Sequence, residues 1–104
     1  MRTIKKRIKW DPSLAADVAV YRVYVEKEPT TVSYDSQYIE VVAPTTQAVV
    51  PDDFPAGTFS EDTLYNMGIS ALDDLGNESD ITPVSAPFDF VAPDAPTNII
   101  VEDL

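Results

Sequence analysis

The sequence predicts an all-β fold, and two observations carry that prediction. The 104 residues contain nine prolines and three glycines, which separate short segments of alternating apolar and polar side chains. The apolar runs are short and rich in Val, Ile and Tyr, residue types that favour strands. A chain of this length buries one hydrophobic core, so we expect a single β-sandwich domain.

The first two strands are predicted by side-chain parity. Residues 3–10 form the first strand, because Ile4, Ile8 and Trp10 face one side of a pleated backbone and Asp11-Pro12-Ser13 follows with turn residues. The second strand carries its inward-facing residues at the same spacing: Tyr21, Val23 and Val25.

A more polar third strand is predicted from Tyr34 to Val42, with a further short strand over residues 47–50. The clearest hairpin follows, since two alternating segments flank the turn-rich residues 73–77. Its inward-facing residues are Tyr65, Met67, Ile69 and Ala71 on one strand, and Val84, Ala86, Phe88 and Phe90 on the other.

The end of the chain differs in character from the rest. Residues 92–96, Ala-Pro-Asp-Ala-Pro, predict a stiff extended spacer, and residues 97–104 predict one more strand. We therefore divide the chain into a sandwich, residues 1–91, and a Pro-rich linker with a C-terminal strand, residues 92–104.

Four short motifs, in this order, resemble a fibronectin type III domain of the bacterial kind. Residues 8–12, Ile-Lys-Trp-Asp-Pro, resemble its second strand, with Trp10 as the core tryptophan, and residues 21–25 resemble its third. Thr63-Leu64-Tyr65 is similar to the entry into its sixth strand, which implies that the Tyr65 hydroxyl bonds back to the main chain. Residues 69–73 and 76–79 resemble that strand and its turn.

The resemblance implies an immunoglobulin-like (fibronectin type III) β-sandwich without catalytic activity, located outside the cell or on a virion or cell surface. Its core would contain Trp10, Tyr21, Val23, Tyr65, Ile69 and Phe88. The basic start of the chain is followed by Lys9, Trp10 and Asp11 rather than by an apolar stretch, so no export signal is predicted.

Both ends depart from the family pattern. A first strand is missing before residues 3–10, whereas residues 95–101 resemble such a strand displaced to the C-terminus. An unpaired edge invites a partner strand, although the charges of Lys5, Arg7 and Lys9 could equally serve to block association there.

We expect the displaced strand to enter another copy, or a related β-sandwich module, stacked head to tail into a filament or surface structure. Entry into its own domain would need a reversal over roughly 23 Å, and residues 91–95 span at most about 17 Å. The predicted anchors are Ile99, Ile100, Val101 and Leu104, with Glu102 and Asp103 meeting the basic edge of Lys5, Arg7 and Lys9.

Composition excludes several functions. With neither Cys nor His, thiolate metal sites and the commoner nucleophile–base pairs are excluded, and the acidic pairs 52–53, 61–62 and 73–74 are not held together, so we predict no enzyme and no cofactor. A net charge of −11 argues against nucleic acid, and the lack of a long apolar run against membrane insertion. All seven basic residues lie between Arg2 and Lys27.

Three alternatives remain open from the sequence. The chain could be one module cut from a tandem array, serving as a spacer or adhesion module. It could bind carbohydrate or protein through an exposed patch of Tyr24, Tyr34 and Tyr38, although packing across strands on the sheet surface is the commoner fate of such tyrosines. A turn rich in oxygen ligands is a weak calcium candidate, whose residues are Asp73, Asp74, Asn77, Glu78 and Asp80.

Overall fold

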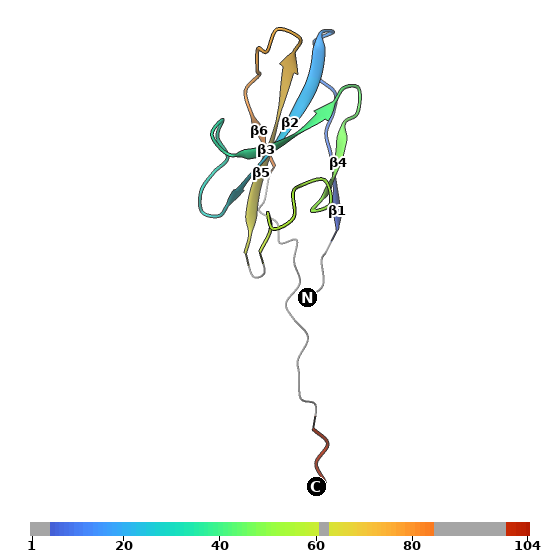
Figure 1. Cartoon of the computed structure of the whole chain (residues 1–104), viewed down its shortest axis with the longest axis vertical. Helices are drawn as coiled ribbons and strands as arrows, with labels where there is room; N and C mark the ends of the chain where they lie inside the picture. The colour runs from blue at the N-terminus through green and yellow to red at the C-terminus, as the bar shows by residue number, and fades with distance from the viewer. Residues whose placement is uncertain (1–4, 61–62, 85–99) are drawn as a thin grey trace.

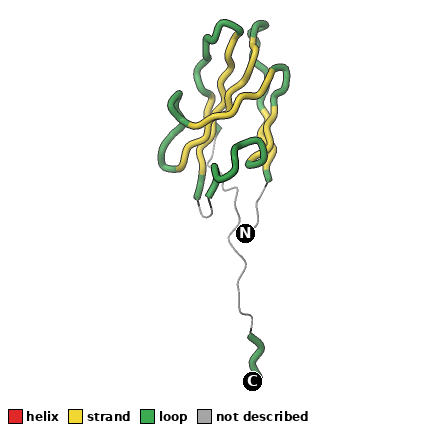
Figure 2. Tube along the Cα trace, in the orientation of Figure 1, coloured by secondary structure: helices red, strands yellow, loops and turns green. Residues whose placement is uncertain are grey.

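A computed structural model describes residues 5–60, 63–84 and 100–104 of the chain (Figure 1). Within these residues there is no helix, and six strands form two antiparallel sheets connected by loops (Figure 2). The predicted all-β class is therefore confirmed, with a sandwich-like arrangement of the sheets.

The smaller sheet pairs β1 (Lys6–Lys9) with β4 (Gln47–Val50). Lys6 lies opposite Val50, and Lys9 lies opposite Gln47. Pairing continues one residue further, because the N–H of Trp10 donates to the carbonyl of Thr46 at 3.1 Å.

The larger sheet has the strand order β3-β2-β5-β6. Its long central strands are β2 (Val18–Lys27) and β5 (Tyr65–Asp73), flanked by β3 (Gln37–Val42) and by the short β6 (Thr82–Pro83). Val23 in β2 lies opposite Ile39 in β3 and Ile69 in β5, which aligns the inward-facing side chains of three strands.

The core lies between the two sheets and draws on both. Its buried members are Val23, Val25, Ala48, Val50, Phe54, Tyr65 and Met67. Tyr65 begins β5, and its hydroxyl accepts a 2.6 Å hydrogen bond from the N–H of Ser60, while its ring packs edge-on against Phe59. This bond ties the loop before β5 to the core in the manner expected of a corner tyrosine.

Strand positions follow the sequence pattern with three differences. The strand after the turn at residues 73–77 is described as β6 at Thr82–Pro83, and Val84, predicted to lie in that strand, follows it. The strand at residues 47–50 lies where predicted, but β3 begins three residues after Tyr34, because Ser33 and Ser36 bond to each other in a turn. Residues 100–104, the described part of the predicted last strand, are not in a strand. Ile4, Ala86, Phe88, Phe90 and Ile99 lie outside the described residues.

Three residues differ from the expected burial. Trp10 and Ile69, predicted core residues, are only partly buried against the core, because both face a groove at its margin. Tyr24, placed by parity on the outer face of the sheet, is 0% exposed, since Tyr34 and Tyr38 pack against it.

Candidate assembly interface

One edge of β1 has no strand partner among the described residues. Trp10 and Thr46 form a hydrogen-bonded pair, and in an antiparallel ladder such pairs alternate with pairs that are not hydrogen-bonded. Ile8 therefore bonds to β4, whereas the N–H and C=O groups of Arg7 and Lys9 point away from β4. The free edge therefore offers main-chain donors and acceptors at two positions two residues apart.

The same two residues make this edge basic. Arg7 and Lys9 are exposed, whereas Lys6 before them and Ile8 between them are partly buried. Lys5 lies just before β1, and its amino group forms a surface ion pair with Asp52 at 3.0 Å. Each free main-chain position thus carries a cationic side chain directed to solvent.

The opposite edge of the small sheet is closed in part by its own loop. Val49 lies opposite Arg7, so its main-chain groups point away from β1. Its N–H donates to the carboxylate of Asp53 at 2.7 Å, and its carbonyl accepts from the N–H of Asp53 at 2.9 Å. Asp53 thus satisfies the main-chain groups of Val49, one of the two positions of β4 that face away from β1, the other being Gln47.

The β3 edge of the large sheet differs from β1 in charge. Ala43 donates to the carbonyl of Ala19, so by alternation the free main-chain groups of β3 belong to Tyr38, Glu40 and Val42. Its only charged side chain is the carboxylate of Glu40. Glu40 is itself paired with Arg22 at 3.1 Å, so β3 offers an acidic segment no unpaired cation of its own, whereas β1 offers Arg7 and Lys9.

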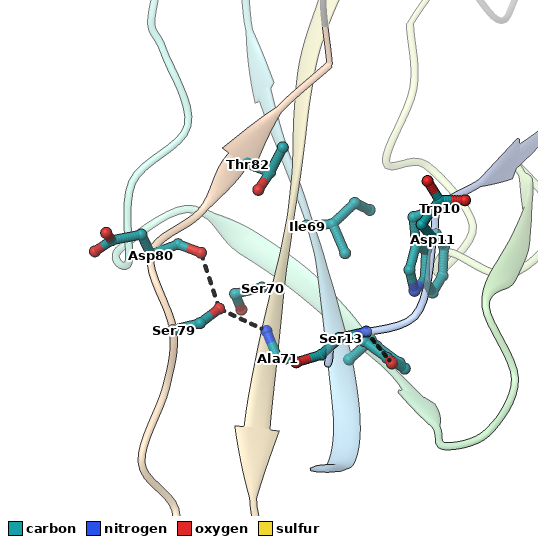
Figure 3. Close-up of a pocket in the computed structure, with 10 residues that line it drawn as sticks. Trp10, Asp11, Ser13, Ile69, Ser70, Ala71, Ser79, Asp80 and Thr82 are labelled. Atoms are coloured by element: carbon teal, nitrogen blue, oxygen red, sulfur yellow. Dashed lines mark hydrogen bonds between the residues drawn. The ribbon is translucent and has the colours of Figure 1, made fainter. Parts of the chain in front are cut away.

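A groove of about 620 Å³ opens between the end of β1 and the strands β5 and β6 (Figure 3). Trp10 lines it from one sheet, and Tyr21, Ile69, Ala71 and Thr82 line it from the other. In Figure 3 the Trp10 ring and the Ile69 side chain face each other across the opening. The core is thus open along the side of the sandwich that contains the free β1 edge.

The indole of Trp10 leaves a polar group unsatisfied in this groove. Its ring packs edge-on against Tyr21 with 5.5 Å between centroids, and its Nε1–H is buried without a hydrogen-bond partner among the described groups. Buried donors are nearly always paired, so this N–H marks a place where a further acceptor is favourable.

The C-terminal residues carry apolar side chains that nothing described here covers. Ile100, Val101 and Leu104 are 76%, 92% and 125% exposed. They lie well away from both sheets, beyond the end of the sandwich at which β1 begins (Figure 1). Glu102 and Asp103 in the same segment are exposed carboxylates.

The outer face of the large sheet holds a polar network centred on Glu78, which the sequence singled out only as a weak calcium candidate. One carboxylate oxygen accepts hydrogen bonds from the Tyr24 hydroxyl and from Ser70 at 2.5 Å, and the other accepts from Arg22 at 3.1 Å. Burial, followed by the hydrogen bond to Glu78, raises the pKa of Tyr24. The network fixes the loop after β5 to the sheet.

The predicted tyrosine patch is only partly present. Tyr34 and Tyr38 are 54% and 40% exposed, but Tyr24 is covered by both of their rings. The Tyr34 hydroxyl donates to the carbonyl of Ser79, and the Arg22 guanidinium lies 4.3 Å from the centre of the Tyr38 ring. The Tyr34 hydroxyl and the Tyr38 ring therefore already have contacts within the chain.

The calcium candidates do not gather into a site. The Asp73 carboxylate accepts hydrogen bonds from the N–H of Leu75 and from the main-chain and side-chain N–H groups of Asn77, and the Asn77 bonds lower its pKa. Glu78 faces the outer-sheet network instead. In the described part of the chain no three acidic side chains lie close enough together to hold a metal ion.

Comparison of the chain with family models, with characterised proteins and with solved structures found no match. The resemblance to a fibronectin type III domain therefore stays a prediction that rests on the quoted residues. Over the described ranges, no helix has the length and apolar character needed to span a membrane.

Proposed function

We propose that this chain is a fibronectin type III-like structural subunit that assembles head to tail, by adding its C-terminal strand to the β1 edge of the next copy. It has no catalytic role, and its place is an extracellular, virion or cell-surface structure. The observation that carries the proposal is the contrast between edges: Asp53 bonds to the outward main-chain groups of Val49 in β4, whereas Arg7 and Lys9 leave β1 open and basic beside a groove.

The tail supplies what this edge lacks. Strand addition forms main-chain hydrogen bonds with Arg7 and Lys9 and moves exposed apolar side chains into the sandwich. Fully burying one Val or Ile side chain contributes about 1.5–3 kcal/mol, from which the cost of ordering the tail and joining two chains is subtracted. Several buried side chains are therefore needed for a stable contact.

The geometry favours a second copy over closure within one chain. The C-terminal residues lie beyond the end of the sandwich where β1 begins (Figure 1), whereas the groove lies beside Trp10, after the far end of β1. In a head-to-tail stack, the C-terminal segment of one copy therefore lies near the Trp10 end of the next copy, where the groove opens. Because this contact is not symmetric, it propagates into a filament unless curvature closes it into a ring.

Sedimentation velocity of the intact chain over a wide concentration range tests the proposal. We expect species larger than a monomer that grow in number with concentration, and filaments or rings in negative-stain images of the same samples. A chain that remains monomeric up to millimolar concentration, with a tail that proteases remove readily, overturns the proposal and favours a spacer module.

A further inference from the structure

We infer the direction and the face of the added strand: the tail of one copy runs antiparallel to β1 of the next, with Ile99 and Val101 turned into the Trp10–Ile69 groove and Ile100 turned to solvent. This inference rests on the proposed function and specifies how its partner, a second copy of this chain, is held. Two observations carry it, one on the charges along the edge and one on the side-chain parity of the tail.

The direction follows from the distribution of charge along the acceptor edge. Arg7 and Lys9 lie along β1, preceded by Lys5 in its ion pair with Asp52, whereas Asp11 and Asp80 line the groove at its far end. A strand that enters beside Trp10 and runs toward Lys5 passes the acidic end with uncharged residues 97–101 and brings Glu102 to Arg7 and Lys9. The parallel direction places the tail carboxylates beside Asp11 and Asp80.

The face follows from alternation along the tail. Side chains of one parity are Ile99, Val101 and Asp103, in which the two apolar residues are adjacent and the carboxylate comes last, where the strand leaves the groove. The other parity places Glu102 between Ile100 and Leu104. Turning the second set inward buries an ionised carboxylate, which is strongly unfavourable without a partner. Turning the first set inward leaves Glu102 on the solvent side, which it shares with the exposed Arg7 and Lys9.

The groove has the chemistry that this strand requires. Trp10, Tyr21 and Ile69 offer apolar surface to Val101 and Ile99, and the unpaired Nε1–H of Trp10 offers a donor to an oxygen of the incoming segment. Ile8, on the inward side of β1, is only partly buried and extends the same surface.

Two adjacent substitutions, Val101→Asp and Ile100→Asp, test the face. Both positions are exposed in the isolated chain, and both changes add the same charge, so the pair is matched in folding and in net charge. Because Val101→Asp turns a carboxylate into the groove, we expect it to weaken assembly about a hundredfold or more. Ile100→Asp should remain within a few fold of the parent.

Trp10, the only tryptophan of the chain, reports on the groove directly. We expect its emission to shift to shorter wavelength as the parent and the Ile100→Asp chain assemble, with no shift for Val101→Asp. If the parent assembles but the two variants are affected equally, or Ile100→Asp is the weaker assembler, the inferred face is wrong. If the parent itself does not assemble, the proposed function fails instead.

Discussion

At the scale of single residues, Glu78 shows how a polar side chain can hold an outer sheet face together. It is 16% exposed in its side chain and accepts hydrogen bonds from three side chains on two strands, Arg22, Tyr24 and Ser70. Tyr24 lies beneath Tyr34 and Tyr38 and is itself fully buried. A second, largely polar layer thus covers the sheet face opposite the core.

Replacing Tyr24 with Phe tests this network. We expect the free energy of unfolding at neutral pH to fall by about 1–3 kcal/mol, because Glu78 loses a hydrogen-bond donor in a partly buried place. Urea denaturation measures the difference. Tyr34→Phe is the matched control, since its exposed hydroxyl bonds only to the carbonyl of Ser79, and it should cost less.

The same variant carries a pH signature. The pKa of Tyr24 is raised in the folded state, by burial first and then by Glu78. The unfolded chain therefore releases its proton first, so the contribution of Tyr24 is complete below about pH 10 and is lost as the pH rises through the folded pKa. The stability difference between the parent and Tyr24→Phe should shrink above that pH, and a constant difference would count against the network.

Sequence patterning located the residues of the core better than the residues around it. Alternation placed Tyr21, Val23 and Tyr65 on the inward face, where they are buried. The same alternation put Tyr24 outward and could not show that the outer face is itself covered, because the covering groups, Tyr34 and Glu78, come from distant segments. The alternation of side chains indicates on which face of the sheet a residue lies, but not whether other segments cover that face.

At the scale of strands, the two edges of the small sheet, β1 and β4, differ in whether their outward main-chain groups are hydrogen-bonded. Asp53 returns to β4 and satisfies both free main-chain groups of Val49. Nothing in the sequence indicates this contact of Asp53 with Val49, since the Asp52-Asp53 pair has the composition of any turn. The open β1 edge, by contrast, was predicted from the family resemblance and depends only on local strand pairing.

Amide hydrogen exchange along β1 tests the state of the two edges. In the monomeric Val101→Asp chain, the N–H groups of Arg7 and Lys9 should exchange much faster than that of Ile8, which bonds to β4. In assembled parent protein, all three should be protected. Val49, bonded to Asp53, serves as an internal control because its protection should not change on assembly. Slow exchange at Arg7 and Lys9 in the monomer would show that another group already occupies the edge.

At the scale of the whole molecule, the uneven distribution of charge determines the orientation in which two copies attract each other. The chain has a net charge of −11, yet its basic residues cluster at the β1 end and its tail is acidic. Two copies therefore repel each other in most orientations and attract when a tail meets the β1 edge.

A charge exchange between Arg7 and Glu102 tests this orientation. Arg7→Glu and Glu102→Arg should each weaken assembly several-fold, and a chain with both changes should recover most of the loss, because the pair is restored with its signs reversed. Lys27→Glu, exposed at the end of β2, is a control with the same charge change as Arg7→Glu away from the edge. Sedimentation equilibrium gives the association constant of each variant. If the effects of the two single changes simply add in the double variant, Glu102 does not contact Arg7 in the assembly.

The central claim, donation of a strand from one copy to the β1 edge of another, is tested most directly by mixing two chains that each lack one half of the contact. Val101→Asp removes the donor, and Arg7→Pro removes an edge N–H that makes no bond to β4 and is tolerated at a strand edge. Each variant alone should be monomeric, and sedimentation velocity of an equal mixture should show a heterodimer of defined size and nothing larger. A mixture in which both chains remain monomeric, or variants that still assemble alone, would contradict strand donation.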